Sequence, residues 1–137
     1  MVTGLMSPVF ERRAMQIEAN PERLAEARQW GYEAAAEAGL GEPDCYQVKL
    51  ALSEAVANAI QHGSSAVGDT IGIDAFEDDG SLIFEVRDGG TFVAPLQPAT
   101  VDAESGRGLE LLTLMMDEVH ITSTAEGSLL RFSKRLG

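Results

Sequence analysis

Three polar side chains stand at four-residue intervals in the stretch SEAVANAIQHG, namely Glu54, Asn58 and His62. On a helix with about 3.6 residues per turn, this spacing stacks side chains along one face. A carboxylate, an amide and an imidazole would then share one slowly drifting edge. Two interpretations remain open at this point, a ligand site and the ordinary solvated face of an amphipathic helix.

Asp88, in the stretch EVRDGG, is the second residue whose type suggests chemistry. It shares strand parity with Phe84 and Val86, so its carboxylate should point toward the apolar layer and not into water. Burying an unpaired charge is costly, and a ligand with a hydrogen-bond donor, such as the amino group of adenine, would pair with it. The alternative is that Asp88 only begins a turn, because Asp before Gly-Gly is favoured there for backbone reasons.

Two glycine-containing segments follow Asp88. Gly89-Gly90 would let the backbone pass close to a ligand, and Gly106-x-Gly108 stands at the start of a predicted helix, where backbone amides favour anions. The loop from 91 to 105 contains two prolines and little periodicity, which is typical of a lid. Glycine also caps and turns chains without binding anything, so these segments carry weight only together with the rest.

Hydrophobic periodicity predicts the elements that position these residues. Val48, Leu52, Ala55, Val56 and Ala59 form an apolar stripe opposite Glu54 and Asn58. In chain order we predict a strand at 9–17, a helix at 20–39 begun by Asn20-Pro21, a helix at 42–63, strands at 71–75 and 82–86 joined by the turn 78–80, a helix at 109–119, and strands at 119–125 and 128–136. This order predicts an α/β fold, a two-layer sandwich with three helices packed on one face of a mixed, mostly antiparallel sheet.

Size and charge limit the classes of function. A chain of 137 residues has the length of one domain, so we expect a single domain over 1–137. The formal net charge is −12, and between Leu50 and Gly106 the only cation is Arg87. Nucleic-acid and anionic-membrane binding need clustered Lys and Arg, so we expect neither. A basic or mixed-charge protein partner fits this charge better.

Cysteine content and hydropathy indicate the compartment. The single cysteine, Cys45, excludes an internal disulfide and is interpreted as an ordinary helix residue. No apolar run is long enough to span a bilayer, and the N-terminus lacks the charged and apolar regions of a signal peptide. We therefore expect a cytoplasmic protein.

Taken together, these segments resemble the GHKL ATP-binding fold, and within it the bacterial anti-sigma-factor serine/threonine kinases. Glu54-x-x-x-Asn58-Ala59-x-x-His62-Gly63 is similar to the N box of that family. Asp88-x-Gly90 is similar to its first glycine box, and Ser105-Gly106-Arg107-Gly108-Leu109 to its second, with the segment MMDEV following. Three boxes in the right order are a specific signal, which any one of them would not be.

The resemblance implies a role for each residue. Asn58 would hold Mg²⁺ against the phosphates of ATP, Asp88 would recognise adenine, and Glu54 would be the general base. Gly90 belongs to the first glycine box, while Gly106 and Gly108 would let the lid fold over the phosphate tail. Arg107 is the best candidate to touch phosphate, although a plain surface arginine fits as well. His62 either hydrogen-bonds near the site or ends the helix.

The sequence also departs from the family. The first glycine box reads DGGTF, so Phe92 replaces a second glycine that is sometimes found there. The histidine-kinase form of the N box has a second Asn and a Lys or Arg, where this chain has Glu54 and His62. We also expect no phosphoacceptor-histidine helix before the domain. Histidine-kinase activity is therefore not expected.

The resemblance implies an anti-sigma factor that sequesters a sigma factor and phosphorylates an anti-anti-sigma partner of the STAS type on Ser or Thr, using ATP and Mg²⁺. A homodimer is compatible with it. Two alternatives remain open: a non-catalytic binding module that uses ATP structurally or not at all, and a kinase that regulates a phosphatase or another non-sigma target. Glu54 favours the enzyme, because a binding module has no obvious need of a carboxylate there.

Overall fold

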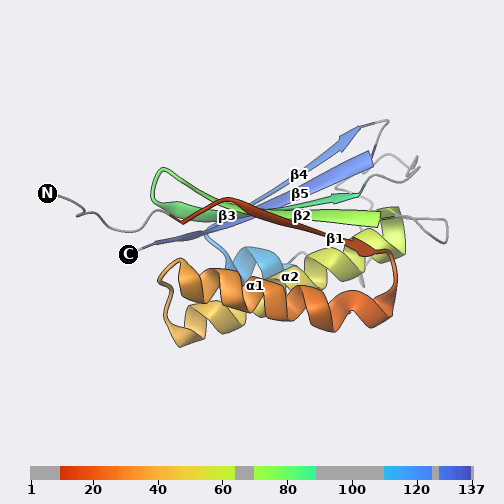
Figure 1. Cartoon of the computed structure of the whole chain (residues 1–137). Helices are drawn as coiled ribbons and strands as arrows, with labels where there is room; N and C mark the ends of the chain where they lie inside the picture. Colours follow the sequence, from red (N-terminus) through yellow and green to blue (C-terminus); the bar gives the residue numbers. More distant parts are fainter. Residues whose placement is uncertain (1–9, 64–69, 89–109, 125–126, 137) are drawn as a thin grey trace, which may run out of the picture.

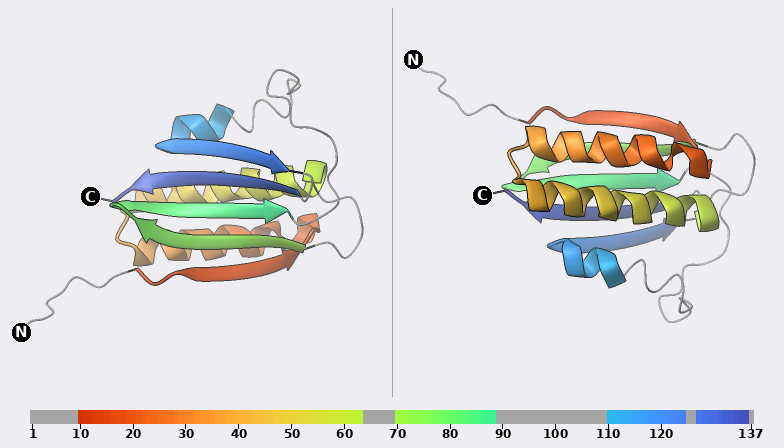
Figure 2. Two further views of the ribbon diagram at one scale, coloured as in Figure 1. Left: turned by 90° about the horizontal axis from the view of Figure 1, so that it is seen from above. Right: turned by 90° about the horizontal axis from the view of Figure 1, so that it is seen from below.

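The computed structural model describes residues 10–63, 70–88, 110–124 and 127–136 and contains one five-stranded sheet in the order β1-β2-β3-β5-β4. All four neighbouring pairs are antiparallel. Helices α1 (Leu24–Glu37) and α2 (Glu42–Asn58) and the helical residues 110–115 cover one face of the sheet (Figures 1 and 2). This arrangement confirms the predicted two-layer sandwich and the predicted order of elements.

The two long helices begin where their capping residues predict. The Asn20 side chain accepts a hydrogen bond from the Glu22 amide at 3.0 Å and starts a 3₁₀ helix, Pro21–Arg23, which leads into α1. α2 starts with a proline in its first turn and is α-helical to Asn58. The prediction of one regular helix to Gly63 was wrong in detail, because Ala59–Gly63 is π-helical.

The strands are β1 (Arg13–Glu18), β2 (Thr70–Asp78), β3 (Ser81–Asp88), β4 (Glu118–Thr124) and β5 (Gly127–Arg135). Asp79 and Gly80 have φ of 53° and 78° and form the predicted turn between β2 and β3. This two-residue connection with positive φ matches the right-handed twist of the strands it joins.

The third helix ends earlier than predicted. We expected it to continue to Val119, but the helical residues stop at 115. The Asp117 amide donates to the carbonyl of Ser133 at 2.9 Å, and Glu118 then pairs with β5. The helix therefore ends four residues before its predicted end at Val119, and strand pairing with β5 begins at Glu118. The predicted first strand also begins later, at Arg13.

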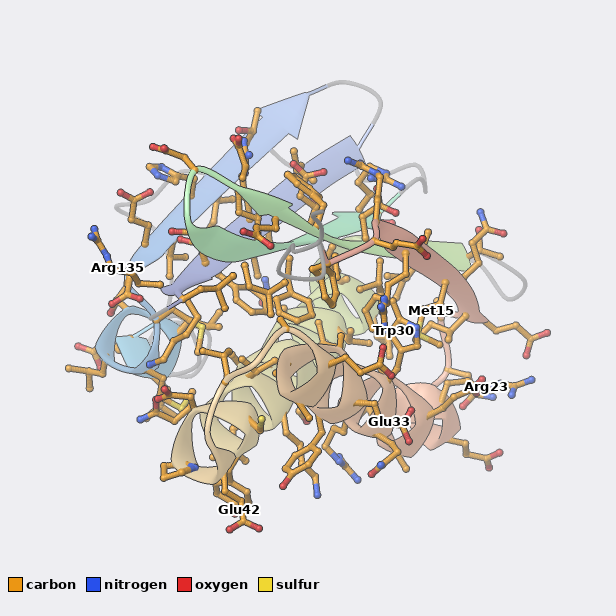
Figure 3. The ribbon with its side chains drawn as sticks, turned by 60° about the vertical axis from the view of Figure 1, so that its left-hand side comes forward. Met15, Arg23, Trp30, Glu33, Glu42 and Arg135 are labelled. Atoms are coloured by element: carbon orange, nitrogen blue, oxygen red, sulfur yellow. The ribbon has the colours of Figure 1, made fainter. Side chains whose placement is uncertain are left out.

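The core lies between the sheet and the helices. Phe84 and Phe132 stack across β3 and β5 with ring centroids 5.3 Å apart, and Trp30 meets Phe84 edge-on. In Figure 3, Met15 and Trp30 lie between the two layers, whereas Glu33 and Glu42 lie on the outer side of the helices. All five residues of the predicted α2 stripe are buried: Val48, Leu52, Ala55, Val56 and Ala59.

Cys45 is part of this core, as the sequence predicted. It is 2% exposed, and its thiol lies 3.4 Å from the Leu40 carbonyl. Burial, followed by the nearby Asp44 and Glu42 carboxylates, raises the pKa of the thiol. A thiol held in its neutral form is a poor nucleophile, which agrees with a structural role.

The uncovered face of the sheet carries an ion-pair network centred on Asp74. Arg87 donates to this carboxylate at 2.6 Å and Arg12 at 3.3 Å, and the Asp74 side chain is 8% exposed. The hydrogen bond from Arg87 holds the pKa of Asp74 below its usual value, although burial opposes the shift. The network joins β2 and β3 to the residue just before β1.

Replacing Asp74 with asparagine is expected to lower the free energy of unfolding at pH 7 by about 1–3 kcal/mol, because charge-assisted bonds to a buried acceptor are lost. The pKa of Asp74 is lower in the folded than in the unfolded chain. Its contribution is therefore present above the unfolded value of about 3.9 and is lost as the pH falls through the folded-state pKa.

Urea unfolding of parent and Asp74→Asn over a pH series from 7 downward measures this difference. The gap between the two proteins should shrink below about pH 4. Glu77→Gln, which removes an exposed carboxylate from the same strand, is the control and should change stability by less than about 0.5 kcal/mol. A gap that stays constant with pH would show that the ion pairs are not its source.

Candidate functional site

Glu54 and Asn58 are half-buried residues on one side of α2. Gln47 lies on the same stripe, seven and eleven residues earlier, and its side-chain oxygen accepts a hydrogen bond from Lys134 of β5 at 2.7 Å. The stripe therefore faces β5 and the helical residues 110–115, on the side of α2 away from α1. The structure thus brings the carboxylate and the amide to one face, one turn apart, as the sequence predicted.

His62 lies beyond the end of α2, within the π-helical turn Ala59–Gly63. A π-helical turn takes more residues per turn than an α-helix, so the regular α-helical backbone spacing that the sequence predicted ends at Asn58. Such turns are found frequently at functional sites. The stretch AIQHG does not predict the change from α-helix to π-helix, because its residue types suit an ordinary helix end.

Asp88 is the last residue of β3, and it is 3% exposed. Burial on the helix-covered face confirms the orientation that strand parity predicted. β3 packs against the π-helical turn, and in both views of Figure 2 the carboxyl ends of β3 and α2 lie at the same end of the molecule. Asp88 therefore lies near the end of α2 that carries Asn58.

The sheet register shows two neighbours of Asp88 that were not predicted from the sequence. Ile71 of β2 pairs with Asp88 on one side, and Ser128 of β5 pairs with it on the other. Directly paired residues share one face of a sheet, so the carboxylate stands between an apolar side chain and a hydroxyl. Strand parity with Leu130 and Phe132 was the signal that could have indicated Ser128.

The remaining predicted site residues lie outside the described part of the chain. These are Gly90, Gly106, Arg107 and Gly108, together with the predicted lid and Phe92. Their roles stay predictions.

The polar side chains of the candidate site suit a metal ion that is held mainly by a bound ligand and only in part by the protein. Within the described residues there is no group of three or more His, Cys, Asp or Glu side chains that could hold a metal ion. Mg²⁺ in phosphate-binding sites takes only one or two protein oxygens, keeps several waters and binds the substrate phosphates. The half-buried Asn58 amide is compatible with such a role, whereas a metal cage made by the protein alone is not supported by the described residues.

The described helices give no sign of a membrane span, since none of them combines the length and apolar character that crossing a bilayer requires.

Comparison with known proteins identifies a matching family and several similar proteins. Residues 17–134 match the family described as the histidine kinase-like ATPase domain. The chain is 32% identical over 121 residues to the serine-protein kinase RsbW of Bacillus licheniformis, which covers 78% of this chain and 75% of the relative. It is 31% identical over 99 residues to an anti-sigma F factor of a Thermoanaerobacter species, covering 66% of this chain and 69% of that protein. It is also 37% identical over 84 residues to the anti-sigma F factor of Clostridium acetobutylicum, covering 56% of this chain and 59% of that one.

Two solved structures are similar. The first contains the RsbU and RsbW domains of a Mycobacterium tuberculosis protein and matches with a TM-score of 0.68 and 25% identity over 90% of this chain, which spans 32% of that longer chain. The second is the histidine kinase domain of a blue-light activated histidine kinase from Erythrobacter litoralis, with a TM-score of 0.57 and 18% identity over 88% of this chain and 62% of that chain. The second likeness is one of fold alone.

Proposed function

Because the chain belongs to the family of histidine kinase-like ATPase domains, we propose that it is an anti-sigma factor with ATP-dependent protein serine kinase activity. It would sequester a sigma factor in the cytoplasm and phosphorylate an anti-anti-sigma partner of the STAS type on Ser or Thr. We treat residues 1–137 as one such domain, which a homodimer would also suit. The similarity to the serine-protein kinase RsbW supports this proposal.

The observation that carries the proposal is that Glu54 and Asn58 share one face of α2. This face lies toward the end of the molecule where Asp88 is buried. In this assignment Asp88 accepts a hydrogen bond from the adenine amino group, and Asn58 is the protein ligand of Mg²⁺. Mg²⁺, when bound, neutralises phosphate charge. Gly90, Gly106, Arg107 and Gly108 would contact the nucleotide from the segment that follows β3.

Glu54 would act as general base for the transfer. Its carboxylate accepts the proton of the serine hydroxyl while that oxygen bonds to the γ-phosphorus of ATP. The bond from the γ-phosphorus to the oxygen that bridges it to the β-phosphorus breaks, and ADP leaves. A carboxylate one helical turn from the metal ligand can reach an acceptor next to the phosphates, whereas the amide of Asn58 cannot take up a proton.

The test is calorimetry of ATP binding with Mg²⁺ and with EDTA. The parent should bind ATP and Mg²⁺ and gain thermal stability, since a ligand of the native state must stabilise it. Asn58→Ala should weaken binding with Mg²⁺ by at least about tenfold, the scale of changes made around bound metals, and leave binding in EDTA as weak as that of the parent.

Gln29→Ala removes an amide from the exposed side of α1 and serves as the control, which should bind like the parent. A parent that gives no heat and no stabilisation with millimolar ATP would refute the nucleotide site. A loss in Asn58→Ala that is equal with and without Mg²⁺ would refute its role as metal ligand.

A further inference from the structure

Lys134 is a cation whose side chain is only 14% exposed, on the helix-covered side of β5. Its ammonium nitrogen donates to the carbonyl oxygen of Met115 at 2.7 Å and to the side-chain oxygen of Gln47 at 2.7 Å. The Asp44 carboxylate lies 3.6 Å away. One ammonium group therefore joins β5, α2 and the last residue of the helical segment 110–115.

Two further hydrogen bonds connect Asp117, just after the helical segment 110–115, to β5. The Asp117 amide donates to the Ser133 carbonyl at 2.9 Å, and the Asp117 carboxylate accepts from the Arg135 amide at 2.5 Å. These bonds connect the bend after residue 115 to β5, and the hydrogen bonds of Lys134 connect it to α2 as well. A cation at the carboxyl end of a helix also interacts favourably with the helix dipole and with its unpaired carbonyls.

We infer that Lys134 is a positioning residue that sets the distance between the two helices framing the nucleotide site. This inference rests on the proposed function, because α2 carries Glu54 and Asn58, and residue 110 follows two residues after Gly108 in the chain. Lys134 itself would not touch ATP. Its bonds would hold the helical segment 110–115, and with it the origin of the proposed phosphate contacts, at a constant place relative to Asn58.

We call the bonds of Lys134 with Gln47 and Met115 the clamp. Loss of the clamp should reduce the affinity for ATP by weakening the contacts with its phosphates. If the helical segment samples several positions against α2, only a fraction of molecules is competent to bind ATP, and the apparent dissociation constant rises by the inverse of that fraction. Adenosine lacks the phosphates and would depend on Asp88, which is held by β3. It should therefore bind almost equally well with or without the clamp.

The experiment compares Lys134→Met with Arg131→Met. Arg131 lies on the same strand, pairs with Glu85 at 3.6 Å and faces the uncovered side of the sheet, so its replacement removes one cation without touching the clamp. We expect Lys134→Met to raise the dissociation constant of ATP about tenfold, to change that of adenosine by less than about twofold, and Arg131→Met to change neither. Lys134→Arg keeps a cation that can reach the same oxygens and should restore most of the affinity.

Gln47→Leu provides a second route, because it removes the acceptor on α2 and leaves Lys134 in place. It should weaken ATP binding in the same direction, and the double variant should be no weaker than Lys134→Met alone, as for residues that act as one unit. Amide hydrogen exchange of residues 110–117 without nucleotide tests the clamp directly, and it should be at least about tenfold faster in Lys134→Met than in Arg131→Met.

Each outcome decides a separate point. A parent that does not bind ATP overturns the proposed function and the role of Lys134 in it, while the exchange data still judge the clamp. If the parent binds ATP but Lys134→Met binds ATP as tightly, or loses adenosine and ATP equally, the positioning role is wrong. Unchanged exchange in residues 110–117 would overturn the clamp itself.

Discussion

Replacing Glu54 with glutamine is expected to slow phosphoryl transfer by about 10²–10⁴-fold, the usual cost of removing a general base. ATP binding should stay within about twofold of the parent, because glutamine keeps the size of the side chain and Asn58 is untouched. Glu54 is half-buried one turn before Asn58, so in the proposed assignment it would act on the acceptor hydroxyl while Asn58 holds the metal. Single-turnover transfer of radiolabelled phosphate, measured beside calorimetric ATP binding, separates the two effects.

Glu42→Gln is the matched control, since it removes an exposed carboxylate from the first turn of the same helix. It should transfer phosphate at the parent rate. Transfer by Glu54→Gln at the parent rate would show that the base is another residue. Glu54→Ala should transfer phosphate as slowly as Glu54→Gln. A large difference between their transfer rates would indicate that the shape of the side chain, and not proton transfer, determines the rate.

Replacing Asp88 with asparagine is expected to weaken ATP binding by about 10–100-fold, which corresponds to the loss of a hydrogen bond to a charged acceptor. It should also narrow the preference for ATP over GTP. A carboxylate can only accept, which suits the amino group of adenine, whereas an amide can also donate and so tolerates the guanine carbonyl. Competition binding with both nucleotides measures the ratio.

Asp74→Asn makes the same chemical change on the opposite face of the sheet and is the control for this prediction. It should lose stability but keep the parent ratio of ATP to GTP affinity. If Asp88→Asn keeps that ratio as well, Asp88 does not recognise the base and its burial has another cause.

The sequence predicted most of the fold because its elements follow local rules. The apolar stripe of α2, the turn at Asp79 and Gly80 and the inward orientation of Asp88 all follow from periodicity and turn chemistry. The end of the third helix was missed because LELLTLMMDEV keeps an apolar helical pattern. Pairing of Glu118 with Ser133 overrides that pattern, and it depends on the following strand, β5, which lies outside the stretch that carries the helical pattern.

The candidate site was predictable only in part, for the same reason. Spacing alone left Glu54 and Asn58 open to two interpretations, and the ordered resemblance of three boxes favoured one of them. The π-helical turn after Asn58 has no signature in its residue types. The position of Ser128 beside Asp88 and the bonds of Lys134 with Gln47 and Met115 arise from tertiary packing, which no short stretch encodes.

Single-turnover transfer of phosphate from γ-labelled ATP to a serine-bearing anti-anti-sigma protein, with Mg²⁺ present, tests the kinase assignment most directly. The parent is expected to label the serine of that protein, Glu54→Gln should label it about 10²–10⁴-fold more slowly, and a partner with alanine in place of the serine should give no label. If the parent binds ATP and a sigma factor but labels no anti-anti-sigma protein, the kinase assignment is contradicted, and a nucleotide-dependent binding module describes the chain instead.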